Sequence, residues 1–149
     1  MSGPCPLCAL ALGEPALGES DVALLYRGDK LSVILVDDVA YPGFCRVVWH
    51  AHVKEISDLA DADRLALNDA VCQVELALRA VMAPDKVNLA SLGNMVPHLH
   101  WHVIPRFADD AHFPDPVWAS VVRQTAESIL SARRALLPQL SAEIIRRMG

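Results

Sequence analysis

The chain has 149 residues, of which 53% are hydrophobic and 21% are charged, a composition typical of one folded domain rather than a disordered chain. Its formal net charge of −5 argues against broad nucleic-acid binding, which needs a basic surface. The longest apolar runs, VALLY and LSVILV, are too short to cross a membrane, and the amino end lacks the pattern of an export signal. We therefore expect a cytoplasmic protein with no membrane or nucleic-acid partner.

Three short strands and a long helix are expected in the first half of the chain. Runs of apolar and β-branched residues predict the strands, which cover 22–29, 31–38 and 45–53. Ser57 is a candidate N-cap for a helix from about Ser57 to Met82, because acidic residues follow it near the helix start. The predicted buried stripe of this helix recurs at three- and four-residue spacing and consists of Leu67, Val71, Val74 and Leu78.

The second half begins with two more strands and ends in helices. A fourth strand is predicted over 86–92, then a glycine turn at Gly93 and a histidine-rich strand over 97–107. Residues 108–118 are expected to form a loop, and the remainder to be helical with a break near Pro138. The fold class is therefore α+β: one domain over 1–149, with a mostly antiparallel sheet, one long packed helix and a helical tail. Its core spans about 5–107 and its carboxyl-terminal extension about 114–149.

The segment PHLHWHVIPRF carries three of the six histidines at two-residue spacing. On a strand this spacing places His98, His100 and His102 on one face and the intervening apolar residues on the other. Such a face has three interpretations. The first is that the face is rich in histidine but has no chemical role, and the second is that it binds a metal ion. The third is nucleophilic catalysis on phosphorus, for which a neutral imidazole is competent near pH 7.

The sequence resembles the histidine triad (HIT) superfamily of nucleotide hydrolases and transferases. HLHWHVI matches its His-φ-His-φ-His-φ-φ signature, where φ is apolar, and VNLASLGN and VIPR match its flanks. The resemblance implies a HIT-like fold and names His100 as the nucleophile that attacks a nucleotide α-phosphorus. His102 is then a phosphate and leaving-group contact, and His98 a supporting member of the triad. The same resemblance assigns the remaining substrate contacts to Asn88, Asn94 and Asp37, with Asp38 as the alternative to Asp37.

A second resemblance concerns the Cys-x-x-Cys pair near the amino end. In several bacterial HIT proteins such a pair completes a structural zinc site with two histidines, and the matching ligands here are Cys5, Cys8, His52 and His98. These four residues are a Cys₂His₂ set suited to tetrahedral Zn²⁺. The alternative is that the two cysteines are ordinary thiols in a reducing cytoplasm. A His98 ring that binds zinc cannot also serve the phosphate.

Together these features predict a hydrolase of nucleotidyl phosphoanhydrides, similar to diadenosine polyphosphate hydrolases, that acts through a covalent nucleotidyl-histidine. The alternatives are a nucleoside phosphoramidase or nucleotidyl transferase, and a catalytically silent, zinc-stabilised nucleotide-binding module. The family resemblance and an edge strand that needs a partner favour a homodimer. Arg106 is either a phosphate contact or a surface ion-pair residue. His112 and Trp118 either fold over a nucleotide base or belong to a plain turn.

Overall fold

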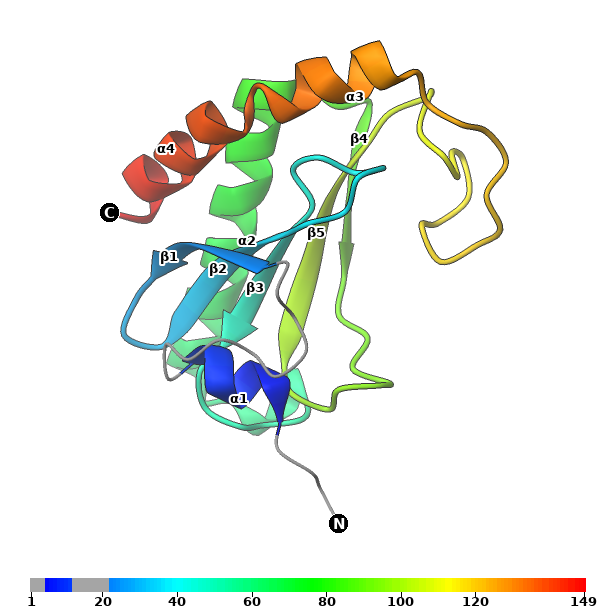
Figure 1. Cartoon of the computed structure of the whole chain (residues 1–149). Coiled ribbons are helices and arrows are strands. Elements are labelled where there is room, and N and C mark those ends of the chain that lie inside the picture. The colour runs from blue at the N-terminus through cyan, green and yellow to red at the C-terminus, as the bar shows by residue number, and fades with distance from the viewer. Residues whose placement is uncertain (1–4, 12–21) are drawn as a thin grey trace.

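The computed structural model describes residues 5–11 and 22–149. Its five strands form one sheet in the order β1-β2-β3-β5-β4, and every neighbouring pair is antiparallel (Figure 1). The elements in chain order are α1 (Pro6–Ala11), β1 (Val22–Arg27), β2 (Leu31–Val36), β3 (Cys45–Trp49), η1 (Ile56–Asp58), α2 (Asp61–Met82), β4 (Lys86–Ala90), β5 (His100–Arg106), α3 (Glu127–Arg134) and α4 (Leu137–Met148). The α+β prediction is confirmed.

The main core lies between one face of the sheet and α2. Because side chains alternate along a strand, β2, β3 and β5 each send every second residue to this face, where Val33, Val47 and Val103 are fully buried. They pack against the predicted stripe of α2, including Leu67 and Val74. Helix α4 packs against α2 and against the edge strand β1 (Figure 1). Because His100 and His102 alternate with Trp101 and Val103 along β5, they lie on the opposite face of the sheet.

The long helix begins later than predicted. Ser57 is not its N-cap, because residues Ile56–Asp58 form a separate 3₁₀ turn that Glu55 and Asp58 close with a capping box. Helix α2 starts at Asp61 after Ala60, and the acidic side chains of its first turn lie at the positive end of the helix dipole. The helix ends at Met82 as predicted, with Ala83 in the left-handed conformation.

The carboxyl-terminal region differs from the predicted continuous helix. Residues 119–126 are not helical, and α3 begins only at Glu127. The break between α3 and α4 falls at 135–136, before Pro138, which lies in the first turn of α4 where proline is tolerated because the missing N–H has no helical partner there. Leu140 and Ile144 of α4 are fully buried in the main core, so this extension packs onto the domain.

The strands are shorter than their sequence patterns suggested. β5 begins at His100, not at residue 97, and β3 ends at Trp49, before His52. No helix in the part of the chain that the structure describes is both long and apolar enough to span a membrane.

Candidate active site and metal site

The three histidines of the triad segment do not share one cavity. His100 and His102 project from β5 and line the same hollow on the face opposite α2. His98 lies before the strand, in a turn in which its backbone N–H donates to the carbonyl of Val96 at 2.8 Å. Its ring is 1% exposed and lies among cysteines, so the expected row of three imidazoles is divided between two sites.

The hollow beside His100 has a volume of about 550 Å³. Its polar wall consists of His100, His102, Asn94 and Arg46, and its apolar wall includes Leu7, Leu92, Met95 and Trp118. Asn94, a predicted substrate contact, therefore lies in the same cavity as the two histidines. A pocket with a few polar groups converging beside apolar side chains is the usual form of a small-molecule site.

The backbone fixes the tautomer of His100. Its Nδ1 lies 2.6 Å from the carbonyl oxygen of His98, and because a carbonyl only accepts hydrogen bonds, Nδ1 must be the donor. A neutral imidazole with its proton on Nδ1 carries its lone pair on Nε2. His100 is thus held in the form that a nucleophile on phosphorus requires.

His102 stays neutral in this site. Burial, together with the nearby His100 and Arg46, lowers its pKa from 6.5 to about 4. The ring meets Phe44 and Trp118 edge to face, with centroid distances of 5.8 and 5.5 Å. His102 is therefore a neutral hydrogen-bonding group, and Trp118, which lies on the loop between β5 and α3, covers part of it.

The four predicted metal ligands come together from three segments of the chain. One donor atom from each of Cys5, Cys8, His52 and His98 lies within 4.8 Å of the other three. His98 Nδ1 is 3.5 Å from both sulfur atoms and 3.1 Å from His52 Nδ1. Zinc bonds of about 2.0 to 2.3 Å at tetrahedral angles separate their ligands by about 3.3 to 3.8 Å, close to these distances.

The chemistry of His98 also fits a metal ligand. Its Nε2 donates to the carbonyl of Trp49 at 2.6 Å, so Nδ1 carries the lone pair that faces the two sulfur atoms. A backbone acceptor that orients the second ring nitrogen is typical of metal-bound histidine. The cluster would tie α1 to the start of β5.

Asn88 and Arg106 lie outside the cavity of His100. Asn88 lines an adjoining hollow between β4 and the loop that carries Trp118, and Trp118 borders both cavities. Arg106 is 2% exposed and forms an ion pair with Asp110. The ion pair is therefore buried, and the interpretation of Arg106 as a surface residue is wrong.

A buried polar network surrounds this ion pair. Asp110 also accepts hydrogen bonds from the hydroxyl of Tyr41 and from the backbone N–H groups of Phe107, His112 and Phe113. Burial alone would raise the pKa of Asp110, but Arg106 and these N–H groups hold it well below its ordinary range. Sequence reasoning missed this network, and the only sequence signal for it was the four-residue spacing of Arg106 and Asp110.

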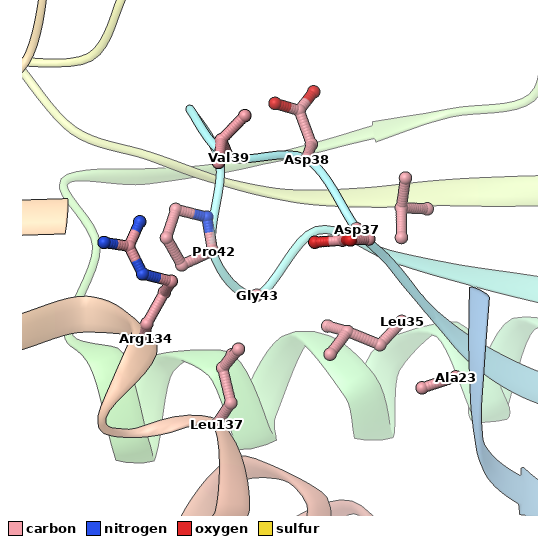
Figure 2. A pocket seen from close by; sticks show the side chains of 10 residues that line it. Ala23, Leu35, Asp37, Asp38, Val39, Pro42, Gly43, Arg134 and Leu137 are labelled. Atoms are coloured by element: carbon pink, nitrogen blue, oxygen red, sulfur yellow. The ribbon is translucent and has the colours of Figure 1, made fainter. Parts of the chain in front are cut away.

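Asp37 lies in a third hollow. That cavity, of about 310 Å³, lies between the turn after β2 and the α3–α4 junction, and it has no described lining residue in common with the cavity of His100. Figure 2 shows the carboxylate of Asp37 lying toward this cavity, opposite Arg134, and that of Asp38 pointing away from it. The predicted substrate contact therefore lies apart from the triad.

The relationship of the chain to known proteins agrees with this geometry. The HIT domain family matches residues 18–109, well over half of the chain. The chain belongs to the HIT domain family. This confirms the resemblance inferred from the triad segment, and the matched region includes β1 to β5 with all three triad histidines.

Among its HIT relatives is a curated protein named AP-4-A phosphorylase from Mycobacterium tuberculosis (strain CDC 1551 / Oshkosh), 28% identical over 105 residues. The match covers 66% of this chain and 54% of the relative, so the chain spans about half the length of the curated proteins it matches.

Solved HIT structures share the fold. A histidine triad protein from Bradyrhizobium japonicum is 26% identical, has a TM-score of 0.70 and covers 88% of this chain and 93% of its own. A zinc-bound histidine triad family protein from Mycobacterium smegmatis is 21% identical and has a TM-score of 0.59. The match covers 93% of this chain and 96% of that protein, and at this identity it shows a shared fold alone.

Proposed function

We propose that this HIT protein hydrolyses nucleotidyl phosphoanhydrides of the diadenosine polyphosphate type through a covalent nucleotidyl-histidine. The observation that carries the proposal is the 2.6 Å hydrogen bond from His100 Nδ1 to the carbonyl of His98, which assigns the lone pair to Nε2 of a ring that lines the cavity. His102 and Asn94 line the same cavity and supply polar contacts for the phosphate oxygens.

The reaction has two displacements. Nε2 of His100 attacks the α-phosphorus, a P–N bond forms, and the P–O bond to the leaving polyphosphate breaks with both electrons on oxygen. Water then attacks the same phosphorus, the P–N bond breaks, and the nucleoside monophosphate leaves with the oxygen from water. The electron pair of the P–N bond returns to Nε2, which restores the neutral imidazole with its proton on Nδ1, and the proton released by the attacking water passes to solvent.

A structural zinc ion completes the proposal. Cys5, Cys8, His52 and His98 would bind it, and the ion would hold α1 against the start of β5. The zinc-bound protein from Mycobacterium smegmatis, which shares this fold, supports the assignment. In this arrangement His98 has a structural role and does not contact the phosphate. Thiol ligands of this kind suit a reducing compartment, in accord with a cytoplasmic protein.

The test is a panel of substrates given to the purified protein and to His100→Ala. Diadenosine tetraphosphate, an adenosine phosphoramidate and ATP are each incubated with the enzyme, products are separated, and the reaction is quenched with acid-free denaturant to trap a phosphorus–nitrogen adduct. We expect AMP from the dinucleotide, an adduct on His100, and neither in His100→Ala. His50→Ala, a histidine substitution outside the cavity, is the matched control and should keep turnover. Saturable nucleotide binding without product or adduct would instead identify the catalytically silent module.

The name of the Mycobacterium tuberculosis relative favours a second candidate, in which inorganic phosphate replaces water in the second displacement. Adding phosphate to the same assay separates the two, because phosphorolysis converts the adenylyl group to ADP and hydrolysis converts it to AMP.

We also propose that two copies pair along β4. This strand is at one edge of the sheet, and its Leu89 is 42% exposed. An unpaired edge with apolar side chains is a template for a second strand. Sedimentation should give a dimer mass, and Leu89→Asp should shift the protein toward the monomer.

A further inference from the structure

Arg106 has a bonding pattern that neither a phosphate ligand nor a simple ion pair needs. Its Nε donates to Asp110 Oδ2 at 2.8 Å and its Nη2 donates to Asp110 Oδ1 at 3.1 Å and to the carbonyl of Asp115 at 2.7 Å. The remaining nitrogen, Nη1, donates to Oδ1 of Asn88 at 2.7 Å. Asp110 neutralises the charge of the guanidinium. Nη1, the nitrogen that does not contact Asp110, donates to Asn88 on the neighbouring strand β4.

This contact decides how the amide of Asn88 is turned. A guanidinium has only donors, so the atom of Asn88 that faces Arg106 must be the oxygen, and the NH₂ group lies on the other side of the amide. Asn88 pairs across the strands with Ile104, which lies between His102 and Arg106 on β5. His102 and Arg106 lie on either side of Ile104 along β5, so an amide whose oxygen faces Arg106 has its NH₂ group on the side of His102. Asn88 lines the hollow that shares Trp118 with the cavity of His100.

We propose that Arg106 is a positioning residue for the substrate site, which acts by holding the Asn88 amide with its NH₂ group toward the phosphates. The inference rests on the proposed function, because it supposes an anionic nucleotide beside His102. Without the bond from Arg106 the amide rotates freely, and half of its orientations present an oxygen to the anion. The Asn88 donor would then be lost and replaced by repulsion.

A double-mutant cycle tests whether Arg106 acts through Asn88. Arg106→Lys keeps a positive charge for Asp110, but a single ammonium cannot reproduce the planar fork that reaches both Asp110 and Asn88. We expect kcat/KM for the dinucleotide to fall by about 10- to 100-fold, the effect of one hydrogen bond to a charged group. In an Asn88→Ala background the same Arg106→Lys change should lower kcat/KM by less than about twofold. Equal losses in the two backgrounds would overturn the proposal, because a merely structural role costs the same in both.

A second variant tests the orientation without disturbing the ion pair. Asn88→Asp is nearly isosteric and keeps an oxygen for Arg106, but its second oxygen replaces the NH₂ group. We expect Asn88→Asp to be less active than Asn88→Ala, since the carboxylate repels the phosphates whereas alanine only omits a contact. Higher activity in Asn88→Asp than in Asn88→Ala would contradict the proposed orientation. This variant decides the question if Arg106→Lys does not fold.

Arg133→Lys is the matched control. Arg133 also pairs with an aspartate of the β5–α3 loop, Asp109, at 2.8 Å, and within the described chain it is not bonded to Asn88. It should keep kcat/KM within about twofold of the wild type.

The orientation can be read even if the wild-type protein proves inactive, which would refute the proposed function alone. In ¹⁵N relaxation measurements the side-chain NH₂ group of Asn88 should be ordered in the wild type and should have a lower order parameter in Arg106→Lys, because the amide then turns about its Cβ–Cγ bond. An unchanged order parameter in Arg106→Lys would overturn the positioning role independently of any turnover.

Discussion

Replacing Asp110 by asparagine should destabilise the folded chain strongly, although the change is nearly isosteric. The carboxylate accepts six hydrogen bonds at its two oxygens: four at Oδ1, from Tyr41, Arg106, His112 and Phe113, and two at Oδ2, from Arg106 and Phe107. An asparagine keeps one oxygen and presents an NH₂ group in place of the other. In its better orientation the asparagine keeps its oxygen at the position of Oδ1. Its NH₂ group then faces two donors, Nε of Arg106 and the backbone N–H of Phe107.

The expected magnitude follows from this count. Each buried donor without an acceptor costs about 1–3 kcal/mol, and the buried Arg106 loses its counter-charge, so we expect a loss of about 3–5 kcal/mol in the free energy of unfolding. For a domain of this size that loss lowers Tm by about 6–20 °C. Urea unfolding at pH 7 followed by circular dichroism measures it, with an unchanged m-value as the sign that the denatured state is the same.

The control for this measurement is Asp115→Asn on the same loop. Asp115 gives the network only its backbone carbonyl, and its side chain is exposed, so the free energy of unfolding should change by less than about 0.5 kcal/mol. An Asp110→Asn variant within about 1 kcal/mol of the wild type at pH 7 would refute the reasoning about the network.

The contribution of Asp110 to the free energy of unfolding depends on pH. The pKa of Asp110 is lower in the folded chain than its ordinary value of about 3.9, so as pH falls below about 4 the unfolded chain binds the proton first. The stabilisation by Asp110 is thus complete above about pH 4 and decreases below it. The difference in the free energy of unfolding between the wild type and Asp110→Asn should therefore be smaller at pH 3 than at pH 7.

Three further predictions concern the metal site, the triad and the carboxyl-terminal extension. Metal analysis of the untagged protein should give about one zinc per chain, and a Cys5→Ser/Cys8→Ser variant should lose it; full metal content in that variant would exclude the four-ligand site. The imidazole of His102 should titrate near pH 4 in nuclear magnetic resonance spectra, since burial lowers its pKa to about 4, and a midpoint near 6.5 would contradict its enclosure. Ile144→Ala should lower the free energy of unfolding by about 2–5 kcal/mol in urea titrations, because the side chain is fully buried against the core; a loss below about 1 kcal/mol would mean that α4 is not part of the cooperative domain.

Local patterns predicted the elements of this fold well where one face of an element is buried. The stripe of α2 and the alternation in β2 and β3 are visible in the sequence because each places apolar residues at the period of its own secondary structure. The helix start was wrong by four residues, because Ser57 satisfies the local rule for an N-cap while Glu55 and Asp58 close a competing turn around it. Such competition between overlapping caps is decided by the packing of the neighbouring chain.

Site residues near one another in sequence were easier to predict than those that depend on tertiary position. The candidate metal ligands join Cys5 and Cys8 to His52 and His98, and only the family resemblance brought these distant residues together. Asp37 is a contrasting case. The resemblance places it with the triad, whereas the turn after β2 places it at a cavity beside α3 and α4. The role of Arg106 depends on its partner on β4, which no periodicity of β5 reveals.

The division of the triad segment at His98 has a physical cause in its backbone. A strand through His98 would have placed its ring beside that of His100, but its N–H bonds the carbonyl of Val96 and the next N–H, of Leu99, bonds the carbonyl of Val53. These bonds turn the His98 ring toward Cys5 and Cys8 while its carbonyl accepts the proton of His100 Nδ1. One residue therefore joins the Cys/His cluster through its side chain and sets the tautomer of the proposed nucleophile through its backbone. The two-residue spacing brings the carbonyl of His98 to Nδ1 of His100, although only His100 and His102 lie on the strand itself.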